Sequence, residues 1–562
     1  MKRLIGIFFA ATLGLVAQDT RYPPDGSQIP GPGRRATPDW VSELSEWQIA
    51  GSGEHEAWLN DLRQWRRERL IRMGYDDAEY RRPELLWTQR NFVQPQMMVE
   101  ERYFYDPAAG TYTVDRYLDD LDKRYGGVDS VLIWPVYPNI GIDNRNQWDL
   151  ARDLPGGVPA LRRTVEDFHR RGVRVFFPSM PWDTGTRDVA QPYWNAAAQL
   201  MAEIGADGVN GDTFDGLPRA YRAASDQTGH PVAFEPEGAP RADEMLMWNN
   251  QSWGYWKYPF APMASKLKWL EPRHMINVCD RWAREKTDNL QAAFFNGVGY
   301  ESWENIWGIW NQITPRDAEA LRRVAHVERQ FADLLVARDW EPYAPTKQYG
   351  VFATRFPGEG RTLWTVVNRN EYDVAGGQVQ VRHTEGARYY DVWNGEEIKP
   401  RLAGADAVLS FAVEARGFGA ILEVMPGSAA QSVSQGMEAT LAQMRQWARV
   451  PLASLSHEWR FLPQRMVEIV STKPTSGSPP GMVRVPAGEF DFQVTGIEIE
   501  GFNWIGLDVQ YPWEDAPRRG HHHRLTIKSF YIDRYPVTNA DFKKFSDDTQ
   551  YRPKDDHNFL KD

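Results

Sequence analysis

Cysteine is almost absent from this chain, which has 562 residues and a single cysteine, Cys279. One cysteine excludes an intrachain disulfide and any metal site built from several cysteines. The sequence also lacks a basic surplus, because 65 lysine and arginine residues stand against 76 aspartate and glutamate residues, a formal charge of −11. A general nucleic-acid-binding protein needs a basic face to neutralise phosphates, so the charge argues against a nucleic-acid partner.

Long apolar runs are missing except at the amino terminus. The basic pair Lys2 and Arg3 precedes an apolar run over Leu4–Val16, and Ala17 offers a cleavage point. This pattern predicts a signal peptide over residues 1–17 and a secreted or periplasmic protein, with a buried first strand or helix as the alternative. No later run approaches the roughly 20 residues of a membrane span, and no cysteine follows the apolar run. We therefore expect neither a membrane partner nor a lipid anchor.

The rest of the composition indicates a globular protein of several domains. Hydrophobic residues make up 42% and charged residues 25% of the chain, and the length suits three or four domains of about 150 residues each. Residues 38–90 predict a helical preface, because Trp58, Leu62, Trp65 and Met73 fall on one helical face. The 24 tryptophans have large flat side chains that could stack on sugar rings, but such side chains also pack in protein cores.

Residues 91–340 alternate between short buried runs and amphipathic stretches. The stretches Ala160–Arg171 and Asn195–Ile204 are each followed by glycine, a signal that a helix ends. Eight such β-α units over about 250 residues predict an α/β fold, a (β/α)8 TIM barrel, with an open doubly wound sheet as the alternative. No glycine-rich phosphate fingerprint follows the first strand, which disfavours a nucleotide-binding sheet. The candidate strands are Phe92–Val99, Ser130–Trp134, Arg174–Pro178, Gly208–Asp212, Val232–Glu235, Leu246–Trp253, Met275–Cys279 and Val298–Trp303.

Acidic residues and tryptophans gather at the expected carboxyl ends of these strands, where barrel chemistry is located. Glycoside cleavage needs two carboxyl groups, one protonated to assist the leaving oxygen and one ionised to attack the sugar or to activate water. Histidine is nearly absent from these ends, which disfavours a histidine metal site or a serine triad. No metal or other cofactor is expected in the barrel. The candidate catalytic residues are Asp212, Glu235 and Asp280, and the candidate substrate-binding residues are Trp134, Trp182, Asp183, Asn210, Asn277, Arg281, Glu301, Trp303 and Glu304.

The stretch from about Asn91 to Val424 resembles a glycoside hydrolase of the retaining α-glycosidase type. The order Asp212, Glu235, Asp280 on the fourth, fifth and seventh strands is similar to the nucleophile, acid/base and third carboxylate of the α-amylase superfamily. The resemblance implies a carbohydrate substrate and a small β-sandwich after the barrel. The chain departs from the superfamily pattern in two places, because no arginine stands two residues before Asp212 and no histidine precedes Asp280.

Several of these carboxylates have alternative roles. Asp212 and Glu235 could be structural, Glu237 competes with Glu235 for the position of the acid, and Asp280 could pair with nearby arginines. The two carboxylates near the eighth strand could be catalytic, substrate-binding or paired. The α-galactosidase-like families also place an aspartate after strand four but take their acid from strand six, where this chain offers only one adjacent acidic pair.

After the barrel, the sequence pattern first predicts β-strands and then linkers. Residues 345–425 predict a β-sandwich of short strands, with Asn394-Gly395 as a hairpin signal. Residues 426–480 predict a polar linker that contains a helix over Met437–Trp447 and ends in a segment rich in serine, proline and glycine.

Residues 481–562 carry the most specific sequence motifs, MVRVPAGEF at 482–490 and FYIDRYPVTNADF at 530–542. They resemble the amino-terminal part of a formylglycine-generating enzyme domain, also called the sulfatase-modifying factor fold. The resemblance implies copper held by two cysteines, or iron or binding functions in other members; residues 481–562 contain no cysteine, so the cofactor is left open. Eighty residues bury little surface, so we expect a partial α+β domain and a fragment. The histidines at 521–523 predict a solvated turn, because three consecutive residues cannot all face one site.

These patterns together predict an exported glycoside hydrolase-like protein that acts on a carbohydrate substrate and is fused to a sulfatase-modifying-factor-type segment. Two alternatives stay open. One is a formylglycine-generating-type oxidase or non-haem iron enzyme whose active site lies beyond Asp562, and the other is a non-catalytic carbohydrate-binding protein. The sequence makes no prediction of the sugar, the linkage or the oligomeric state.

Overall fold

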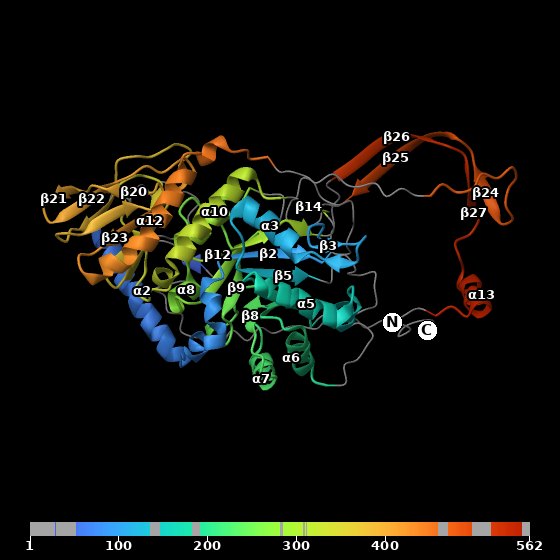
Figure 1. The fold of residues 1–562 in the computed structure, drawn as a ribbon, viewed down its shortest axis with the longest axis horizontal. Helices are drawn as coiled ribbons and strands as arrows, with labels where there is room; N and C mark the ends of the chain where they lie inside the picture. Colours follow the sequence, from blue (N-terminus) through green and yellow to red (C-terminus); the bar gives the residue numbers. More distant parts are fainter. Residues whose placement is uncertain are drawn as a thin grey trace, which may run out of the picture.

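The computed structural model describes residues 28–29, 52–99, 101–134, 147–181, 191–280, 285–306, 309–310, 312–458, 470–496 and 519–552. A central barrel has a β-sandwich on one side and two long hairpin strands on the other (Figure 1). The predicted signal peptide and three predicted site residues, Trp182, Asp183 and Arg281, lie outside the described residues. None of the described helices combines the length and the apolar character needed to cross a membrane.

Eight parallel strands form the central sheet in the order β8-β7-β6-β5-β2-β12-β11-β9, which is the strand order of a (β/α)8 barrel. The two end strands, β8 and β9, also lie against each other, so the sheet is nearly closed. This confirms the predicted TIM barrel rather than the open sheet. The strands are β2 (Val93–Met98), β5 (Ser130–Trp134), β6 (Arg174–Ser179), β7 (Gly208–Gly211), β8 (Ala233–Pro236), β9 (Gln251–Tyr255), β11 (Met275–Cys279) and β12 (Gly299–Trp303).

The sixth predicted strand is displaced along the chain. A short 3-10 helix, η3 (Asp243–Met247), occupies the first part of the predicted Leu246–Trp253, and the strand begins only at Gln251. The acidic residues at the start of η3 suit the amino-terminal turn of a helix, where backbone N–H groups are unpaired. The apolar pattern of this stretch therefore belongs to two elements rather than to one strand.

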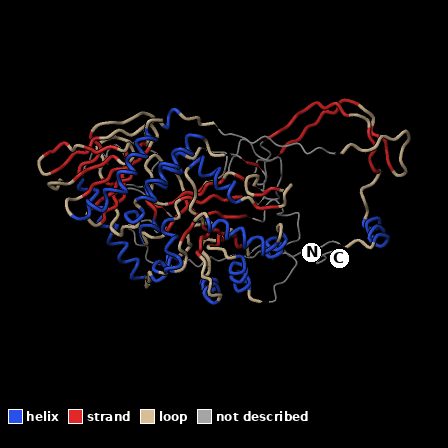
Figure 2. The backbone as a smooth tube through the Cα atoms, in the orientation of Figure 1, coloured by secondary structure: helices blue, strands red, loops and turns tan. Residues whose placement is uncertain are grey.

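Helices surround the barrel strands (Figure 2). Two of them end near glycines, as the sequence predicts: Gly205 directly follows α6 and Gly172 stands two residues after the end of α5, with positive φ angles of 81° and 76°. Side chains other than glycine rarely adopt that conformation. The helices are α3 (Val114–Tyr125), α4 (Gln147–Asp153), α5 (Gly157–Arg170), α6 (Tyr193–Ile204), α7 (Arg219–Gln227), α8 (Lys266–Leu270), α9 (Thr287–Asn296), α10 (Pro315–Gln330) and α11 (Ala332–Leu335).

Of the predicted preface, residues 52–90 are described and are mostly helical, whereas residues 38–51 lie outside the described residues. Helix α2 (Ser52–Met73) buries Leu62 and Trp65 in the main core. The 3-10 helices η1 (Ala78–Arg81) and η2 (Pro83–Arg90) follow it. The side chain of Leu85 is buried in the same apolar cluster as the barrel residue Phe176, so η2 packs on the barrel.

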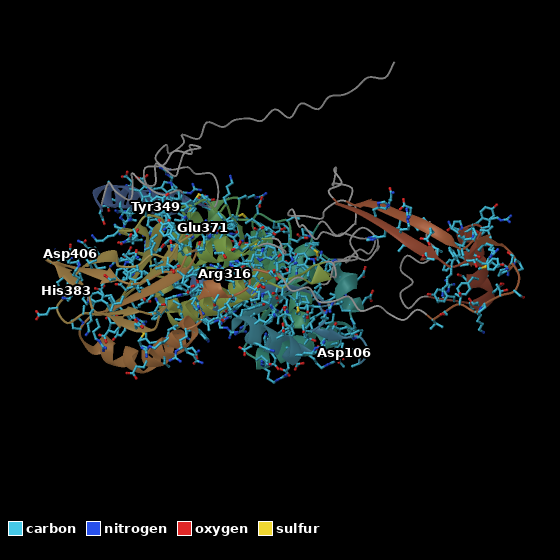
Figure 3. All side chains as sticks on the ribbon, turned by 90° about the horizontal axis from the view of Figure 1, so that it is seen from above. Asp106, Arg316, Tyr349, Glu371, His383 and Asp406 are labelled. Carbon is cyan, nitrogen blue, oxygen red and sulfur yellow. The ribbon has the colours of Figure 1, made fainter. Side chains whose placement is uncertain are left out.

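A β-sandwich follows the barrel. A six-stranded and a three-stranded sheet face each other over a core that includes Trp364, Leu409 and Ile421. Figure 3 shows His383 and Asp406 at this end of the molecule, away from Asp106 of the barrel domain. Asn394 and Gly395 form the turn between two paired strands, as the hairpin signal predicts. The strands are β15 (Glu341–Ala344), β16 (Val351–Gly358), β17 (Arg361–Asn368), β18 (Gly377–Arg382), β19 (Arg388–Asp391), β20 (Glu396–Ile398), β21 (Arg401–Ala403), β22 (Asp406–Ser410) and β23 (Phe418–Val424).

Beyond helix α12 (Ser428–Ala448), which packs on the main core, the carboxyl-terminal part extends away from the barrel (Figure 1). Helix α12 begins nine residues before the predicted start of Met437. Strands β24 and β27 pair with each other, as do β25 and β26. The histidines at 521–523 lie in β26, so the predicted turn is wrong. The elements are β24 (Met482–Val485), β25 (Gly488–Gly496), β26 (Arg519–Ile527), β27 (Phe530–Asp533) and α13 (Asn539–Thr549).

Gly299 at the start of β12 gives a first testable prediction. A Cβ atom at this position would overlap the side chain of Asn277 and lie 2.7 Å from the carbonyl oxygen of Asn91. We expect Gly299→Ala to destabilise the barrel by about 1–3 kcal/mol, because a buried site without free space must shift its backbone. Urea unfolding followed by tryptophan fluorescence measures this loss. Gly477→Ala, at a position with open space and without a positive φ, is the control, and equal losses in both variants would contradict the packing argument.

Candidate active site

Two of the predicted catalytic residues come from neighbouring barrel strands. Asp212 directly follows β7, and Glu235 lies in β8, where it pairs in register with Asn210. Alternate residues of a strand face the same side, so Asn210 and Asp212 belong to the same face of β7. Both carboxyl groups are buried, with exposed fractions of 5% for Asp212 and 0% for Glu235. The structure therefore brings the two residues together at the carboxyl-terminal half of adjacent strands.

Glu235 projects into the barrel interior, where amide side chains surround it. Nδ2 of Asn277 donates a hydrogen bond of 2.7 Å to Oε1 of Glu235. The side-chain amide of Gln94 lies 2.8 Å from Oε2 of Glu235. Burial raises the pKa of Glu235 to about 7, although the hydrogen bonds from neighbouring side chains lower it in part. A carboxyl group with this pKa exchanges its proton near neutral pH, as a general acid/base must.

Glu301 from β12 faces Glu235 across the interior. The amide of Gln94 lies 2.9 Å from Oε2 of Glu301, so a single amide contacts both carboxyl groups. Glu301 is completely buried. Burial and the charge of Glu235 raise its pKa well above the usual value for glutamate. Burial next to the candidate acid/base therefore favours the protonated form of Glu301.

A further acidic residue, Glu237, lies at the rim above Glu235. Its Oε2 accepts a hydrogen bond of 2.7 Å from the backbone N–H of Thr213, and its Oε1 accepts one of 3.0 Å from the hydroxyl of Tyr255. Thr213 has a φ of 63°, an uncommon conformation for a residue other than glycine, and it directly follows Asp212. Strained backbone of this kind is concentrated at functional sites, which supports a functional rim at the end of β7.

The tryptophans at the strand ends pack inside the barrel. Trp134 and Trp303 are each 3% exposed and belong to one apolar cluster with Trp253, Met180 and Cys279. The rings of Trp253 and Trp303 lie 5.8 Å apart between centroids at an angle of 54°. The predicted sugar-binding role of Trp134 and Trp303 therefore remains a prediction, and in this structure both rings contribute to the barrel core.

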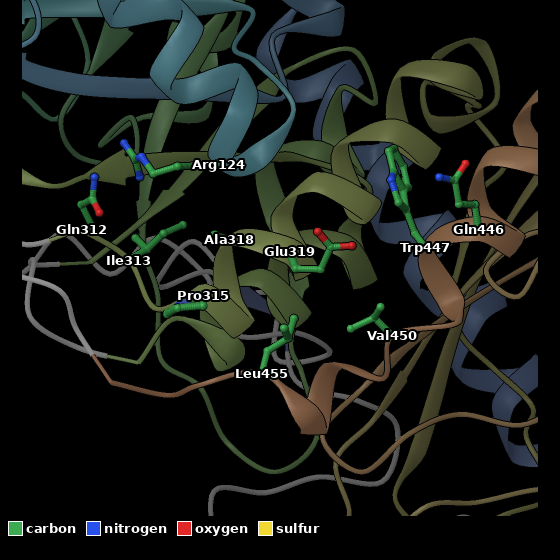
Figure 4. A pocket seen from close by; sticks show the side chains of 10 residues that line it. All are labelled: Arg124, Gln312, Ile313, Pro315, Ala318, Glu319, Gln446, Trp447, Val450 and Leu455. Carbon is green, nitrogen blue, oxygen red and sulfur yellow. The ribbon is translucent and has the colours of Figure 1, made fainter.

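Glu304, which follows β12, is engaged with an arginine. Its two oxygens accept hydrogen bonds of 2.7 and 2.8 Å from Arg124 of α3, and Oε1 also accepts one of 2.8 Å from the backbone N–H of Ile313. A cavity of about 450 Å³ lies beside this pair, between α10 and the end of α12, and it is lined by Arg124, Glu319 and Trp447 among others (Figure 4). Glu304 is thus paired with Arg124 rather than with the carboxyl groups of the interior, and its predicted role in substrate binding stays a prediction.

The remaining predicted residues in the described part of the chain are Asn210, Asn277 and Asp280. Asn210 and Asn277 are buried among the interior side chains that include Glu235. Asp280 directly follows β11 and is half-buried, and its backbone carbonyl accepts a hydrogen bond from Lys286. Gln94 was missed in the sequence analysis, although its position on the same face of β2 as Gln96 is a signal for a polar barrel interior. Within the described ranges, no group of three or more histidine, cysteine, aspartate or glutamate residues is arranged to hold a metal ion.

The raised pKa of Glu235 predicts a specific dependence of stability on pH. Between its usual pKa of 4.5 and about 7, the folded protein keeps a proton that the unfolded chain has released. The free energy of unfolding must then fall as pH rises through this window, by about 3 kcal/mol from this group. We expect Glu235→Gln to reduce the slope of the free energy of unfolding between pH 5 and 7.5 in urea unfolding. An unchanged slope in the variant would contradict the assignment.

The comparisons with known proteins identify one domain by sequence. Residues 467–561 match the family described as Sulfatase-modifying factor enzyme 1-like domain. The search of curated proteins found no match. Among solved structures, the chain is similar to an α-amylase from Anoxybacillus, with 11% identity, a TM-score of 0.43, and coverage of 61% of this chain and 99% of that chain.

Two further solved structures have comparable similarity. An α-amylase from Geobacillus thermoleovorans complexed with acarbose has 11% identity and a TM-score of 0.43, covering 60% of this chain and 99% of that one. A maltogenic α-amylase from Thermotoga neapolitana has 12% identity and a TM-score of 0.43, with the same two shares covered.

Proposed function

We propose that the barrel hydrolyses a glycosidic bond, with Asp212 as the nucleophile and Glu235 as the acid/base. The observation that carries this proposal is the buried Glu235 carboxyl group, whose pKa is raised to about 7 and which lies on the strand next to that of Asp212. A retaining glycosidase needs one such group to protonate the leaving oxygen and later to activate water, while a second carboxylate attacks the sugar.

The chemistry can be followed at the two carboxyl groups. In the first step an oxygen of Asp212 attacks the anomeric carbon while Glu235 gives its proton to the leaving glycosidic oxygen. A covalent bond between Asp212 and the sugar forms as the glycosidic bond breaks. In the second step the ionised Glu235 takes a proton from water, whose oxygen attacks the anomeric carbon and releases Asp212.

The interior amides support Glu235 in this role. Asn277 donates to one oxygen of Glu235, and the amide of Gln94 contacts the other. Both amides come from rigid strands, β11 and β2, so they restrict the orientation of the carboxyl group. Glu237 at the rim is the alternative acid, and its contacts with Thr213 and Tyr255 would hold it near Asp212.

The proposal is tested by incubating the full chain with a panel of aryl glycosides that covers α and β linkages and several sugars. We expect release of the aryl group from at least one substrate. Absence of hydrolysis across the panel and across natural oligosaccharides would overturn the proposal. Binding of those oligosaccharides without hydrolysis would instead favour a carbohydrate-binding protein.

A further inference from the structure

Two hydrogen bonds fix the backbone on either side of Asp212. Its own N–H donates to the carbonyl oxygen of Ser179 in β6 at 3.2 Å. The next N–H along the chain, that of Thr213, donates to Oε2 of Glu237 at 2.7 Å. These two N–H groups belong to the two peptide units that flank the Cα atom of Asp212. Together the bonds therefore set the direction of the Cα–Cβ bond of Asp212.

The turn after Asp212 has a conformation that needs support. Thr213 has a φ of 63°, and its side chain is exposed, so neither the freedom of glycine nor burial stabilises the left-handed backbone. The carbonyl oxygen of Gly211 accepts from the N–H of Phe214 at 3.2 Å and from that of Glu237 at 3.0 Å. These bonds join the turn to the segment after β8. A left-handed residue of this kind persists only where the surrounding structure holds it.

The carboxyl group of Glu237 is itself held by a second strand. Its Oε1 accepts a hydrogen bond of 3.0 Å from the hydroxyl of Tyr255 at the end of β9. The ring of Tyr255 lies edge-on to that of Trp253 in the same strand, with centroids 6.0 Å apart and an angle of 78° between the planes. Packing against Trp253 restricts where the hydroxyl can lie. Each oxygen of Glu237 thus accepts one hydrogen bond, one from the turn and one from β9.

We propose that Glu237 is a positioning residue for Asp212. Its carboxylate accepts from the N–H of Thr213, and the hydroxyl of Tyr255 keeps the carboxylate in that place. This pair of contacts, the Glu237 clamp, holds the turn in its left-handed conformation and keeps the Cα–Cβ bond of Asp212 in one direction.

The clamp differs in its chemistry from a general acid. An acid must give its proton to the leaving group, whereas Glu237 only accepts hydrogen bonds in this role. The catalytic use of the clamp rests on the proposed hydrolase function, in which Asp212 attacks the anomeric carbon. A reacting group displaced by about 1 Å can lose about a hundredfold in rate. The clamp itself is a property of the free protein and can be tested without a substrate.

The first test measures hydrogen exchange at the N–H of Thr213 in the full chain without substrate, by mass spectrometry with fragmentation to single residues. We expect this N–H to exchange at least about tenfold more slowly than an unprotected one, because its bond to a carboxylate must open first. Glu237→Met should remove the protection, and Glu237→Gln should keep it, because the glutamine carbonyl still accepts. Exchange at the unprotected rate in the unsubstituted chain, or unchanged protection in Glu237→Met, would overturn the proposal.

The matched control is Asp373→Leu in the sandwich. Oδ1 of Asp373 accepts a hydrogen bond of 2.8 Å from the backbone N–H of Ala415, so this variant also loses a bond between an exposed carboxylate and the backbone. We expect it to leave exchange at Thr213 unchanged. Equal loss of protection at Thr213 in Asp373→Leu and Glu237→Met would indicate a general loss of stability and would overturn the local clamp.

The second test compares kcat and KM for the aryl glycosides that the chain hydrolyses. We expect Glu237→Met to lower kcat about a hundredfold and to leave KM within about twofold, because a displaced nucleophile slows the reacting step. Glu237→Gln should restore kcat to within about threefold of the unsubstituted chain, for easy and poor leaving groups alike, because it keeps both contacts. If Glu237→Gln lost as much as Glu237→Met, and most with poor leaving groups, Glu237 would be the acid and the positioning role would be overturned.

The outcomes separate the clamp from the hydrolase function. Protection at Thr213 that depends on Glu237, in a chain that hydrolyses no glycoside, would retain the clamp and remove only its catalytic use. Protection that does not depend on Glu237, in a chain that hydrolyses glycosides, would overturn the clamp and leave the hydrolase. If Glu237→Met does not fold, Tyr255→Phe replaces it, because it removes only the hydroxyl that holds the carboxylate. We then expect a partial loss of protection at Thr213, and full protection would contradict the clamp.

Discussion

Replacement of Asp212 by asparagine is expected to reduce hydrolysis of the best aryl glycoside by at least about a hundredfold in kcat/KM. The substitution keeps the shape of the side chain and removes the charge that attacks the sugar. Asp212 follows β7 directly and is 5% exposed, so asparagine should fit without a change of fold. Steady-state kinetics with the full chain measures the effect.

The matched control is Asp215→Asn, because Asp215 is an exposed acidic residue three positions further along the same loop. We expect this variant to retain activity within about twofold of the unsubstituted chain, as is usual for a surface substitution. If Asp212→Asn retained full activity, another carboxylate would be the nucleophile. If both variants lost activity equally, the effect would be one of loop structure rather than of a reacting group.

Replacement of Glu235 by glutamine is expected to have an effect that depends on the leaving group. Substrates whose aryl group leaves easily need little protonation, so their first step should slow only modestly. Substrates with a poor leaving group should lose roughly 10²–10⁴-fold in rate, the usual contribution of general acid catalysis. The limb of the pH profile near pH 7 should also disappear, because the group that titrates there is removed.

Glu101 provides the control for the pH profile. It is 2% exposed, and burial raises its pKa to about 7, as it does for Glu235. Its Oε2 accepts a hydrogen bond from the backbone N–H of Tyr103 rather than from the barrel interior. We expect Glu101→Gln to retain the limb near pH 7. Loss of the limb in Glu101→Gln and its survival in Glu235→Gln would reverse the assignment.

The barrel could be predicted from sequence because its signals are local. Buried parallel strands appear in the sequence as short apolar runs. Glycines such as Gly172 and Gly205 mark the ends of the helices that precede these strands. The start of α12 was missed because residues 428–436 are rich in small and polar side chains, which resemble a linker. The strand near Leu246 was misplaced because a 3-10 helix shares its apolar residues.

The candidate site was predictable only in part, because its central contacts join distant strands. Asp212 and Glu235 lie on consecutive strands, so their proximity follows from the barrel. Glu301 and Gln94 come from the eighth and first barrel strands, which are 207 residues apart in sequence and meet only when the sheet closes. No local pattern reports that one amide contacts two carboxyl groups. The role of Gln94 therefore emerged only from the arrangement of the interior side chains.

The most direct test of the central claim is to trap the covalent intermediate. The full chain is incubated with a fluorinated glycosyl fluoride of the sugar that the panel identifies, and the labelled peptide is located by mass spectrometry. The account predicts one sugar per chain attached to Asp212 and no label in Asp212→Asn. A label on Glu235, Glu237 or any other residue, or continued hydrolysis with no label at all, would contradict it.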